Sequence, residues 1–200
     1  MRENMRQANI HRKTLETDVE LDLVLDPGDE QNITIQTGVG FFDHMLTLMA
    51  HWAGLGLKVH CRGDLHVDAH HSLEDVGICL GQALAKALED KKGINRVGQA
   101  RVPLDEALCE CVLDISGRPY LVYQGDQILP ALVAGEERDV YREFFKSLAC
   151  NSGMNLHLSF HYGQNGHHLM ESAFKSLGLA LRQAVALGRT NLLSTKGALD

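Results

Sequence analysis

The sequence predicts an α+β fold of two internally repeated halves, each an antiparallel sheet packed with helices. The first observation is a helical pattern that opens with His-His-x-x-Glu at residues 70–74 and returns at residues 167–171. Both copies continue with the skeleton Leu-Gly-x-Ala-Leu-x-x-Ala, at a constant offset of 97 residues from His70 to His167. The second observation is that alternating apolar and polar residues, typical of strands, precede each helix. Such a repeat predicts two similar structural units.

The elements of the two halves can be matched in order along the chain. The first half contains a strand, a turn, a helix start, a strand and the long helix, at residues 19–25, 26–29, 42–49, 57–60 and 70–88. The second half has counterparts at residues 107–115, 116–119, 143–148, 154–157 and 167–185. The offset of 97 also pairs His60 with His157. We expect each half to read strand, strand, helix, one or more strands, helix, with halves at residues 1–95 and 96–200 that form one compact domain.

The composition limits the function classes that are worth considering. With 200 residues, 44% hydrophobic and 22% charged, the chain has the composition of an ordinary globular protein. Its net charge of −7 argues against nucleic acid as a partner, because nucleic-acid-binding proteins usually have a basic face. No apolar stretch approaches the roughly 20 residues of a membrane span, and the first 14 residues contain no apolar signal-peptide core. We therefore expect a cytoplasmic protein that binds neither nucleic acid nor membrane.

The five cysteines are expected to be reduced thiols, because an odd number does not suggest a disulfide framework. Cys109 and Cys111 form a Cys-x-Cys pair that would point to one face of a strand. Such a pair can bind metal. Packing within the sheet is the interpretation that we favour, since cysteine is so often buried.

The two His-His-x-x-Glu motifs predict a metal site. On a helix, the Glu of each motif lies about one turn from both of its histidines, so the three side chains reach one neighbourhood. The two adjacent imidazoles diverge by roughly 100° and therefore serve two ions, or one ion and one substrate group. Imidazole and carboxylate together suit Mn, Fe, Co or Zn. One such motif is more typical of a solvated helix start, but two copies at equivalent positions of a repeat indicate a metal-dependent enzyme.

Basic and hydroxyl side chains in three turn regions predict a small phosphorylated substrate. Arg96 lies in a glycine-flanked loop, and Arg118 lies in a turn at a strand end. Near the C-terminus, residues 194–197 combine hydroxyls, backbone N–H groups and the Lys196 ammonium, which together can hold a phosphate. Turn chemistry alone explains each feature taken singly, so the prediction depends on their occurring together.

Over essentially its whole length, the chain resembles the imidazoleglycerol-phosphate dehydratase family of histidine biosynthesis. The most specific marks are Phe-Asp-His-Met-Leu at 42–46, Gly-Asp at 63–64, His-His-Ser-Leu-Glu-Asp at 70–75, Asp-Ile-Ser-Gly-Arg-Pro at 114–119, and Gly-His-His at 166–168 with Glu171 and Lys175. The resemblance implies a fold like the second domain of ribosomal protein S5 and a site with two Mn²⁺ ions. It also implies homo-oligomers, in which trimers assemble into a particle of twenty-four subunits with active sites between subunits.

The resemblance also implies roles for particular residues. The metal ligands match His44, His70, His71, Glu74, Glu143, His167, His168 and Glu171. The substrate-binding positions match Glu16, Arg96, Arg118, Lys175, Ser194 and Lys196. The chain departs from the family at Glu143, where a histidine equivalent to His44 is usual, and at Trp52, where a histidine is common and His51 lies beside it. A carboxylate is a competent Mn²⁺ ligand, so we expect Glu143 to serve as one.

The reaction implied by the resemblance is the dehydration of imidazole glycerol phosphate to imidazole acetol phosphate, catalysed by a hydro-lyase. A metal ion on the ring nitrogen would act as a Lewis acid and stabilise an imidazolate-like intermediate, while the catalytic residues Glu16 or Glu171 move protons. Two other functions stay open. One is a metal buffer or metal-assembled structural protein, which needs no phosphate-binding groups, and the other is a kinase-like protein, for which no glycine-rich loop is evident.

Overall fold

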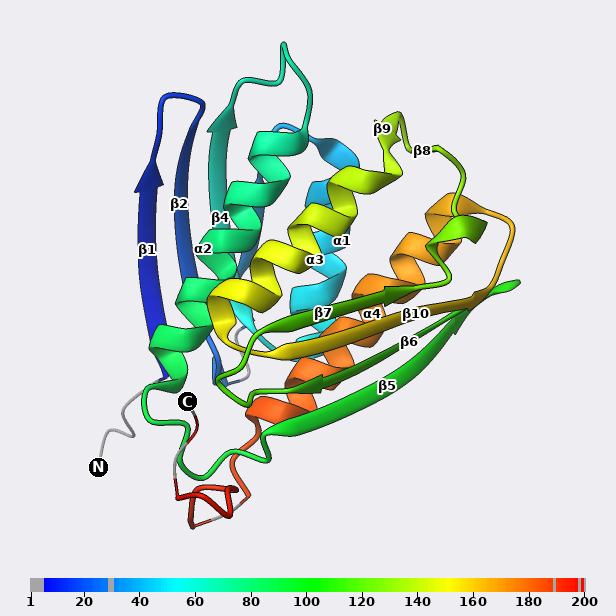
Figure 1. The fold of residues 1–200 in the computed structure, drawn as a ribbon. Helices are drawn as coiled ribbons and strands as arrows, with labels where there is room; N and C mark the ends of the chain where they lie inside the picture. Colours follow the sequence, from blue (N-terminus) through cyan, green and yellow to red (C-terminus); the bar gives the residue numbers. More distant parts are fainter. Residues whose placement is uncertain (1–5, 29–30, 189, 198, 200) are drawn as a thin grey trace.

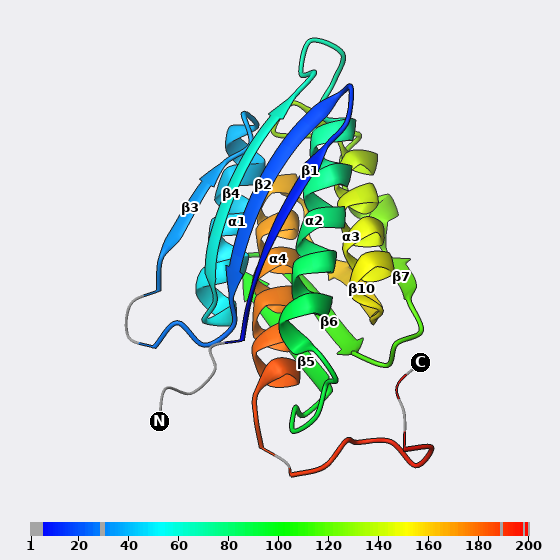
Figure 2. The same cartoon turned by 90° about the vertical axis from the view of Figure 1, so that its left-hand side faces the viewer.

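In the computed structural model, which describes residues 6–28, 31–188, 190–197 and 199, two four-stranded sheets enclose two layers of helices (Figures 1 and 2). The sheet of the first half is covered by α1 (Gly40–Ala53) and α2 (His70–Leu88). The sheet of the second half is covered by α3 (Arg138–Ser152) and α4 (Gly166–Val185). The helix layers meet in the middle, where α1 packs against α4 and α2 against α3. The predicted α+β fold, with helices packed on the sheet of each half, is confirmed.

Each half forms its own sheet, and the two sheets have matching strand orders. The first follows the order β1, β2, β4, β3, with bounds Gln7–Lys13, Thr17–Val24, Gly56–Gly63 and Ile33–Gln36. The second follows the order β5, β6, β10, β7, with bounds Val97–Leu104, Ala107–Asp114, Asn155–Tyr162 and Tyr120–Gln124. The 3-10 turn η1 (Asp126–Ile128) and the short strands β8 (Leu132–Val133) and β9 (Glu136–Glu137) lead into α3. Residues 1–5 of the N-terminal segment, and Asp29 of the predicted turn, lie outside the described residues.

Before its first helix, each half has one sheet strand more than the repeat predicts, and each sheet is mixed. β3 pairs in parallel with β4, and β7 in parallel with β10, whereas the other neighbours within the two sheets are antiparallel. The cause is the connection, since α1 lies between β3 and β4 and α3 lies between β7 and β10. A helical crossover of this kind returns the chain in the same direction. β3 and β7, one edge strand in each sheet, are therefore exceptions to the predicted antiparallel pairing.

The pairing register corrects one alignment between the halves. Leu57 of β4 and Leu156 of β10 occupy equivalent places, because each pairs with the penultimate residue of its neighbour, β2 or β6. The offset between these two strands is therefore 99 residues rather than 97, and His60 does not correspond to His157. The difference arises because the connection from strand to His-His pair is two residues longer in the first half.

Glycine lets the helices of the two halves approach closely. A Cβ at Gly81 of α2 would lie 2.7 Å from the Cβ of Asn151 and 2.8 Å from the carbonyl oxygen of Leu148, both in α3. A Cβ at Gly178 of α4 would lie 2.6 Å from the carbonyl oxygen of Met49 in α1. Both glycines come from the skeleton that the two long helices share. That part of the repeat therefore serves packing between the halves.

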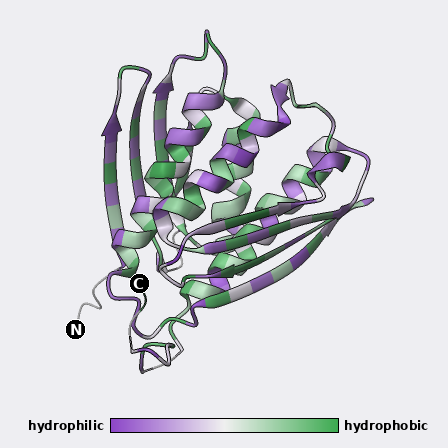
Figure 3. Ribbon diagram, in the orientation of Figure 1, coloured by the Kyte–Doolittle hydropathy of each residue, from purple (hydrophilic) through white to green (hydrophobic). Residues whose placement is uncertain are grey.

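The apolar interior follows the alternation along the strands, which Figure 3 shows as changes of colour. In β2 and β6 every second residue is buried, so that one face of each sheet covers the helices. All five cysteines are free thiols, as predicted. Cys109 and Cys111 are both 0% exposed in β6, which confirms packing as the reason for their spacing. None of the described helices is long and apolar enough to cross a membrane.

Candidate active site

All four long helices begin at the same end of the molecule, the upper end in Figure 1. The two His-His-x-x-Glu motifs therefore lie at this end, in the first turns of α2 and α4. Side chains bind the first backbone N–H groups of both helices. Asp68 Oδ1 accepts from the N–H of His70 at 2.7 Å, and Asn165 Oδ1 accepts from the N–H of His167 at 2.9 Å. The helix N-termini also give this end a positive partial charge, which favours acidic groups.

The tightest cluster of possible metal ligands joins the two halves. The Nε2 atoms of His44 in α1 and His167 in α4 lie 3.4 and 3.2 Å from Glu171 Oε2. One ligand atom from each residue lies within 4.8 Å of the other two, and within the described residues no other group of three is this close. The cluster depends on the packing of α1 against α4, so neither half forms it alone. Two imidazole nitrogens and a carboxylate oxygen fit a borderline divalent ion such as Mn²⁺.

Lys175 and Trp52 form one wall beside this cluster. Lys175 Nζ lies 2.5 Å from Glu171 Oε1 and 5.2 Å from the centre of the Trp52 ring. Burial alone would raise the pKa of Glu171, but hydrogen bonds from Lys175, His167 and His44 outweigh it and hold the pKa below the ordinary 4.5. Glu171 is therefore ionised and able to bind a cation. Trp52, which stands where the family commonly has histidine, packs against the lysine instead, while His51 is exposed.

His71 and His168, the second histidines of the two motifs, face a different direction from the first histidines, as the helical geometry predicts. The rings of His70 and His71 are inclined by 79°, and those of His167 and His168 by 81°. His71 Nδ1 lies 3.0 Å from Asp64 Oδ2, and its Nε2 lies 3.9 Å from Glu16 Oε2. Each motif therefore presents its two imidazoles to different surroundings.

The corresponding place between α2 and α3 has a different set of side chains. Glu143, the counterpart of His44, accepts a hydrogen bond from Lys146 Nζ at 2.7 Å. This hydrogen bond and the negative charge of Glu143, and to a smaller extent the charge of Glu74, raise the pKa of Lys146. The two glutamates therefore lie near one lysine. His70 begins α2 one turn before Glu74. These residues are the second candidate site, although within the described residues they are not a group of three ligands as close together as the first cluster.

The predicted phosphate-binding arginines lie at the other end of the molecule. Arg96 precedes β5, whose eight residues span roughly 25 Å before the hairpin at the histidine end. Arg96 donates through Nε and Nη2 to Asp114 at 2.6 and 2.8 Å, and through Nη1 to the carbonyl oxygen of Leu193 at 2.6 Å. Within the single chain, its guanidinium is thus already paired and holds the C-terminal segment in place.

The predicted substrate-binding residues are therefore divided between the two ends of the molecule. Arg118 and Lys196 are exposed, and Ser194 Oγ accepts a hydrogen bond from the backbone N–H of Lys196 at 3.2 Å. The C-terminal segment after α4 and the connection between β6 and β7, which carry these residues, lie at the end opposite the helix N-termini (Figure 1). Glu16 and Lys175, in contrast, lie at the histidine end.

Two carboxylates at the histidine end have no role in the sequence prediction. Asp64 contacts His71, and Glu106 Oε2 contacts His168 Nδ1 at 2.7 Å. The repeat contains a signal for Glu106, because it lies in the β5–β6 hairpin at the place where Glu16 lies in the β1–β2 hairpin. The elements matched between the halves in the sequence do not include these hairpins.

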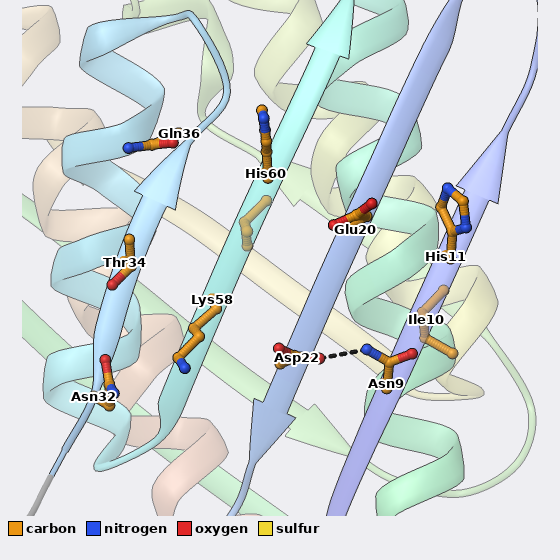
Figure 4. Close-up of a pocket in the computed structure, with 11 residues that line it drawn as sticks. Asn9, Ile10, His11, Glu20, Asp22, Asn32, Thr34, Gln36, Lys58 and His60 are labelled. Atoms are coloured by element: carbon orange, nitrogen blue, oxygen red, sulfur yellow. Dashed lines mark hydrogen bonds between the residues drawn. The ribbon is translucent and has the colours of Figure 1, made fainter.

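A hollow on the described surface lies away from these groups. It is about 670 Å³ in volume and lies on the outward face of the first sheet, where Figure 4 shows polar side chains from β1, β2, β4 and β3. Asn9 donates a hydrogen bond to Asp22 there, and His11 binds Asp18 at 2.8 Å. None of the predicted site residues lines this hollow.

Comparison with known proteins gives a consistent result. The family model for imidazoleglycerol-phosphate dehydratase matches residues 37–181. A protein of this name from Oleidesulfovibrio alaskensis is 62% identical over 195 residues, which cover 98% of each chain. One from Streptococcus sanguinis is 52% identical over 197 residues, which cover 98% of this chain and 100% of the relative.

Solved structures agree in fold. Imidazoleglycerol-phosphate dehydratase from Staphylococcus aureus has a TM-score of 0.81 at 34% identity, with 91% of this chain and 99% of that chain covered. IGPD from Pyrococcus furiosus in complex with (S)-C348 has a TM-score of 0.81 at 36% identity, with 95% and 100% covered. Identity at this level along nearly the whole chain, together with the shared fold, means that the chain belongs to the imidazoleglycerol-phosphate dehydratase family and is a hydro-lyase.

Proposed function

We propose that the chain is a manganese-dependent enzyme of the cytoplasm that dehydrates imidazole glycerol phosphate to imidazole acetol phosphate in histidine biosynthesis. The name of its relatives supports the substrate. The observation that carries the metal dependence is the cluster of His44, His167 and Glu171, three ligands brought together from two halves of the fold.

In this proposal the protein holds two Mn²⁺ ions. His44, His167 and Glu171 would hold one, and His70, Glu74 and Glu143 would hold the other. His71 and His168, which point away from their own motifs, would supply further nitrogen ligands. When bound, the metal would supply Lewis acidity, which stabilises the negative charge that develops on the imidazole ring as a proton leaves.

The two proposed catalytic glutamates differ in their surroundings. The side chain of Glu16 is 57% exposed, and its carboxylate lies 3.9 Å from His71 Nε2, beyond hydrogen-bonding distance. Glu171 is 13% exposed and bound by Lys175. We therefore assign removal of the carbon-bound proton to Glu16, and metal ligation to Glu171. The proton taken up by Glu16 would pass to the leaving hydroxyl, which departs as water, and the enol that is left would move its hydroxyl proton to carbon to give the ketone product.

Single substitutions separate these two roles. Glu16→Gln should lower turnover by at least about 100-fold, because it removes a general base, and should leave Mn²⁺ binding unchanged. Glu171→Gln should lower both turnover and Mn²⁺ binding. Equal Mn²⁺ binding by Glu171→Gln and wild type would remove Glu171 from the ligands, and undiminished turnover by Glu16→Gln would remove it as the base.

The distance between the two ends supports an assembled enzyme. Arg96, Arg118, Ser194 and Lys196 are too far from the histidines to hold the phosphate of the same small substrate within one chain. We propose that these residues come from a neighbouring copy, so that active sites form between subunits of trimers that assemble into a particle of twenty-four. Arg96 would then keep the C-terminal segment in place for Ser194 and Lys196.

A metal store is the competing function for a histidine-rich protein. It would bind Mn²⁺ without regard to the substrate. Binding of a phosphorylated imidazole analogue, measured with and without Mn²⁺, separates the two functions. Binding that strengthens with Mn²⁺ supports the enzyme, and binding that is absent in both states contradicts it.

A further inference from the structure

The two β-hairpins at the histidine end place a glutamate at equivalent positions. Arg12 pairs with Val19 in the first sheet, and Val102 pairs with Cys109 in the second. Both hairpins therefore align at an offset of 90 residues, and Glu16 corresponds to Glu106. Each lies beside the second histidine of one His-His-x-x-Glu motif.

Both carboxylate oxygens of Glu106 contact residues at the start of α4 or just before it. Its Oε1 accepts hydrogen bonds from the backbone N–H groups of Gln164 at 3.1 Å and Asn165 at 2.7 Å. Its Oε2 lies 2.7 Å from His168 Nδ1. Because a carboxylate only accepts, the proton of the neutral imidazole must be on Nδ1. The lone pair on Nε2 is then available to a metal.

In the first half, Asp64 rather than the hairpin glutamate contacts the Nδ1 atom of the second histidine. His71 Nδ1 lies 3.2 and 3.0 Å from the two carboxylate oxygens of Asp64, which comes from the connection between β4 and α2. Glu16, the hairpin glutamate, is instead on the Nε2 side of His71, at 3.9 Å. Its backbone N–H is held by the Thr14 hydroxyl at 3.1 Å. The hairpin backbone is therefore held in place at Glu16. The Glu16 carboxylate, in contrast, lies beyond hydrogen-bonding distance of His71.

We propose that the two equivalent hairpin glutamates have divided roles: Glu106 is a positioning residue that sets the tautomer of His168, and Asp64 does the same for His71. Since Asp64 has taken over that task in the first half, Glu16 is free to move protons. This inference rests on the proposed metal-dependent function. It adds two positioning residues and explains why only one of two equivalent glutamates is catalytic.

The contacts of Glu106 make the Gln variant a sharp test. The two backbone N–H groups require an acceptor, so the amide oxygen of Glu106→Gln must take the place of Oε1. The amide nitrogen then faces His168 Nδ1 and donates to it. His168 must carry its proton on Nε2, which can no longer ligate a metal. The side chain keeps its shape while the tautomer is reversed.

The experiment measures tautomers and metal affinity separately. Metal-free protein labelled with ¹⁵N-histidine is studied by magic-angle-spinning NMR in alkaline buffer, and His168 is assigned by the signal that is lost in His168→Gln. We expect the proton on Nδ1 in wild type and on Nε2 in Glu106→Gln. Calorimetric titration with Mn²⁺ should give about 10- to 100-fold weaker binding for Glu106→Gln. Glu16→Gln, the matched variant in the equivalent hairpin, should change neither quantity.

Several results would overturn the inference. A proton on Nε2 of wild-type His168 contradicts it without any variant, as does wild-type Mn²⁺ affinity in Glu106→Gln. An equal loss of affinity in Glu16→Gln would show that the two glutamates are not divided in role. If wild-type protein binds no Mn²⁺, the proposed function fails, whereas the tautomers of the metal-free protein still decide the positioning role.

Discussion

At the scale of single residues, Glu143 is where the two candidate metal sites differ most. The site between α1 and α4 has His44, whereas the site between α2 and α3 has Glu143 in its place, next to Lys146. The second site is therefore richer in carboxylate and poorer in imidazole. Carboxylate ligands favour Mn²⁺ and Mg²⁺ over softer ions, so the two sites should differ in metal preference.

Substitutions at Glu143 test this difference. Glu143→Gln should lower the bound Mn²⁺ by about one ion per chain, because a charged ligand is lost. Glu143→His should keep two ions and increase the preference of that site for Zn²⁺ or Co²⁺. Metal content after dialysis against limiting metal, measured by elemental analysis, distinguishes the variants. Unchanged Mn²⁺ content in Glu143→Gln would show that Glu143 is not a ligand.

The Glu106–His168 pair predicts a pH-dependent stability of the metal-free protein. A hydrogen bond from His168, with backbone N–H donors, lowers the pKa of Glu106 from 4.5 to about 2, so this contribution is lost as pH falls from 4.5 towards 2. Glu106 in turn raises the pKa of His168 above 6.5, so this contribution is lost as pH rises beyond that raised value. Thermal unfolding of wild type and Glu106→Gln should therefore differ most between pH 4.5 and 6.5. A difference that does not vary with pH would contradict the pairing.

Much of the residue-scale site could be predicted, but some of it depends on the folded chain. The doubled motif and the family resemblance identify His44, His167 and Glu171, which the fold brings together. The contact between Lys175 and Trp52 has no signal in the sequence, because it depends on how α1 crosses α4. The sequence predicts that Arg96 binds phosphate. Its pairing with Asp114 is visible only in the folded sheet, where Val97, the next residue, pairs with Asp114.

At the scale of elements, close packing between the helices of the two halves holds the candidate sites together. α1 and α4 carry the proposed ligands of one candidate site, and α2 and α3 carry those proposed for the other. Gly178 in one pair and Gly81 in the other are points of close approach. A repeat read from sequence predicts the helices, but not that each one packs against a helix of the other half.

Adding a side chain at these glycines should destabilise the fold. Gly178→Ala and Gly81→Ala should each cost about 1–3 kcal/mol, because the new Cβ meets backbone of the facing helix. The effect of Gly178→Ala should extend to the metal affinity of the site with His44. Gly40→Ala, where a Cβ meets nothing within 4 Å, is the control. Equal denaturation midpoints for all three variants would contradict this account of the packing.

The sheets illustrate a limit of pattern reading at the same scale. The alternation in β2 and β6 correctly predicts strands with one buried face. β3 has only four residues and a weak pattern, and its parallel pairing follows from the crossover through α1. Strand direction depends on such connections, which a local pattern does not contain.

At the scale of the whole molecule, the two ends of the chain hold different parts of the proposed site. A mixing experiment tests whether they meet between copies. His167→Ala and Arg118→Ala should each be inactive alone. When the two are assembled together, some sites combine intact ends from different chains, and up to about a quarter of the activity should return. No recovery in particles shown to contain both variants would contradict shared sites.

The central claim, a metal-dependent dehydratase, is tested most directly by removing and restoring the metal. Purified protein is stripped with a chelator, and formation of imidazole acetol phosphate from imidazole glycerol phosphate is measured before and after Mn²⁺ is added. The account predicts that stripped protein is inactive, that Mn²⁺ restores turnover, and that His44→Ala is not restored. Full activity in the stripped protein, or no dehydration of this substrate after Mn²⁺ is bound, would contradict it.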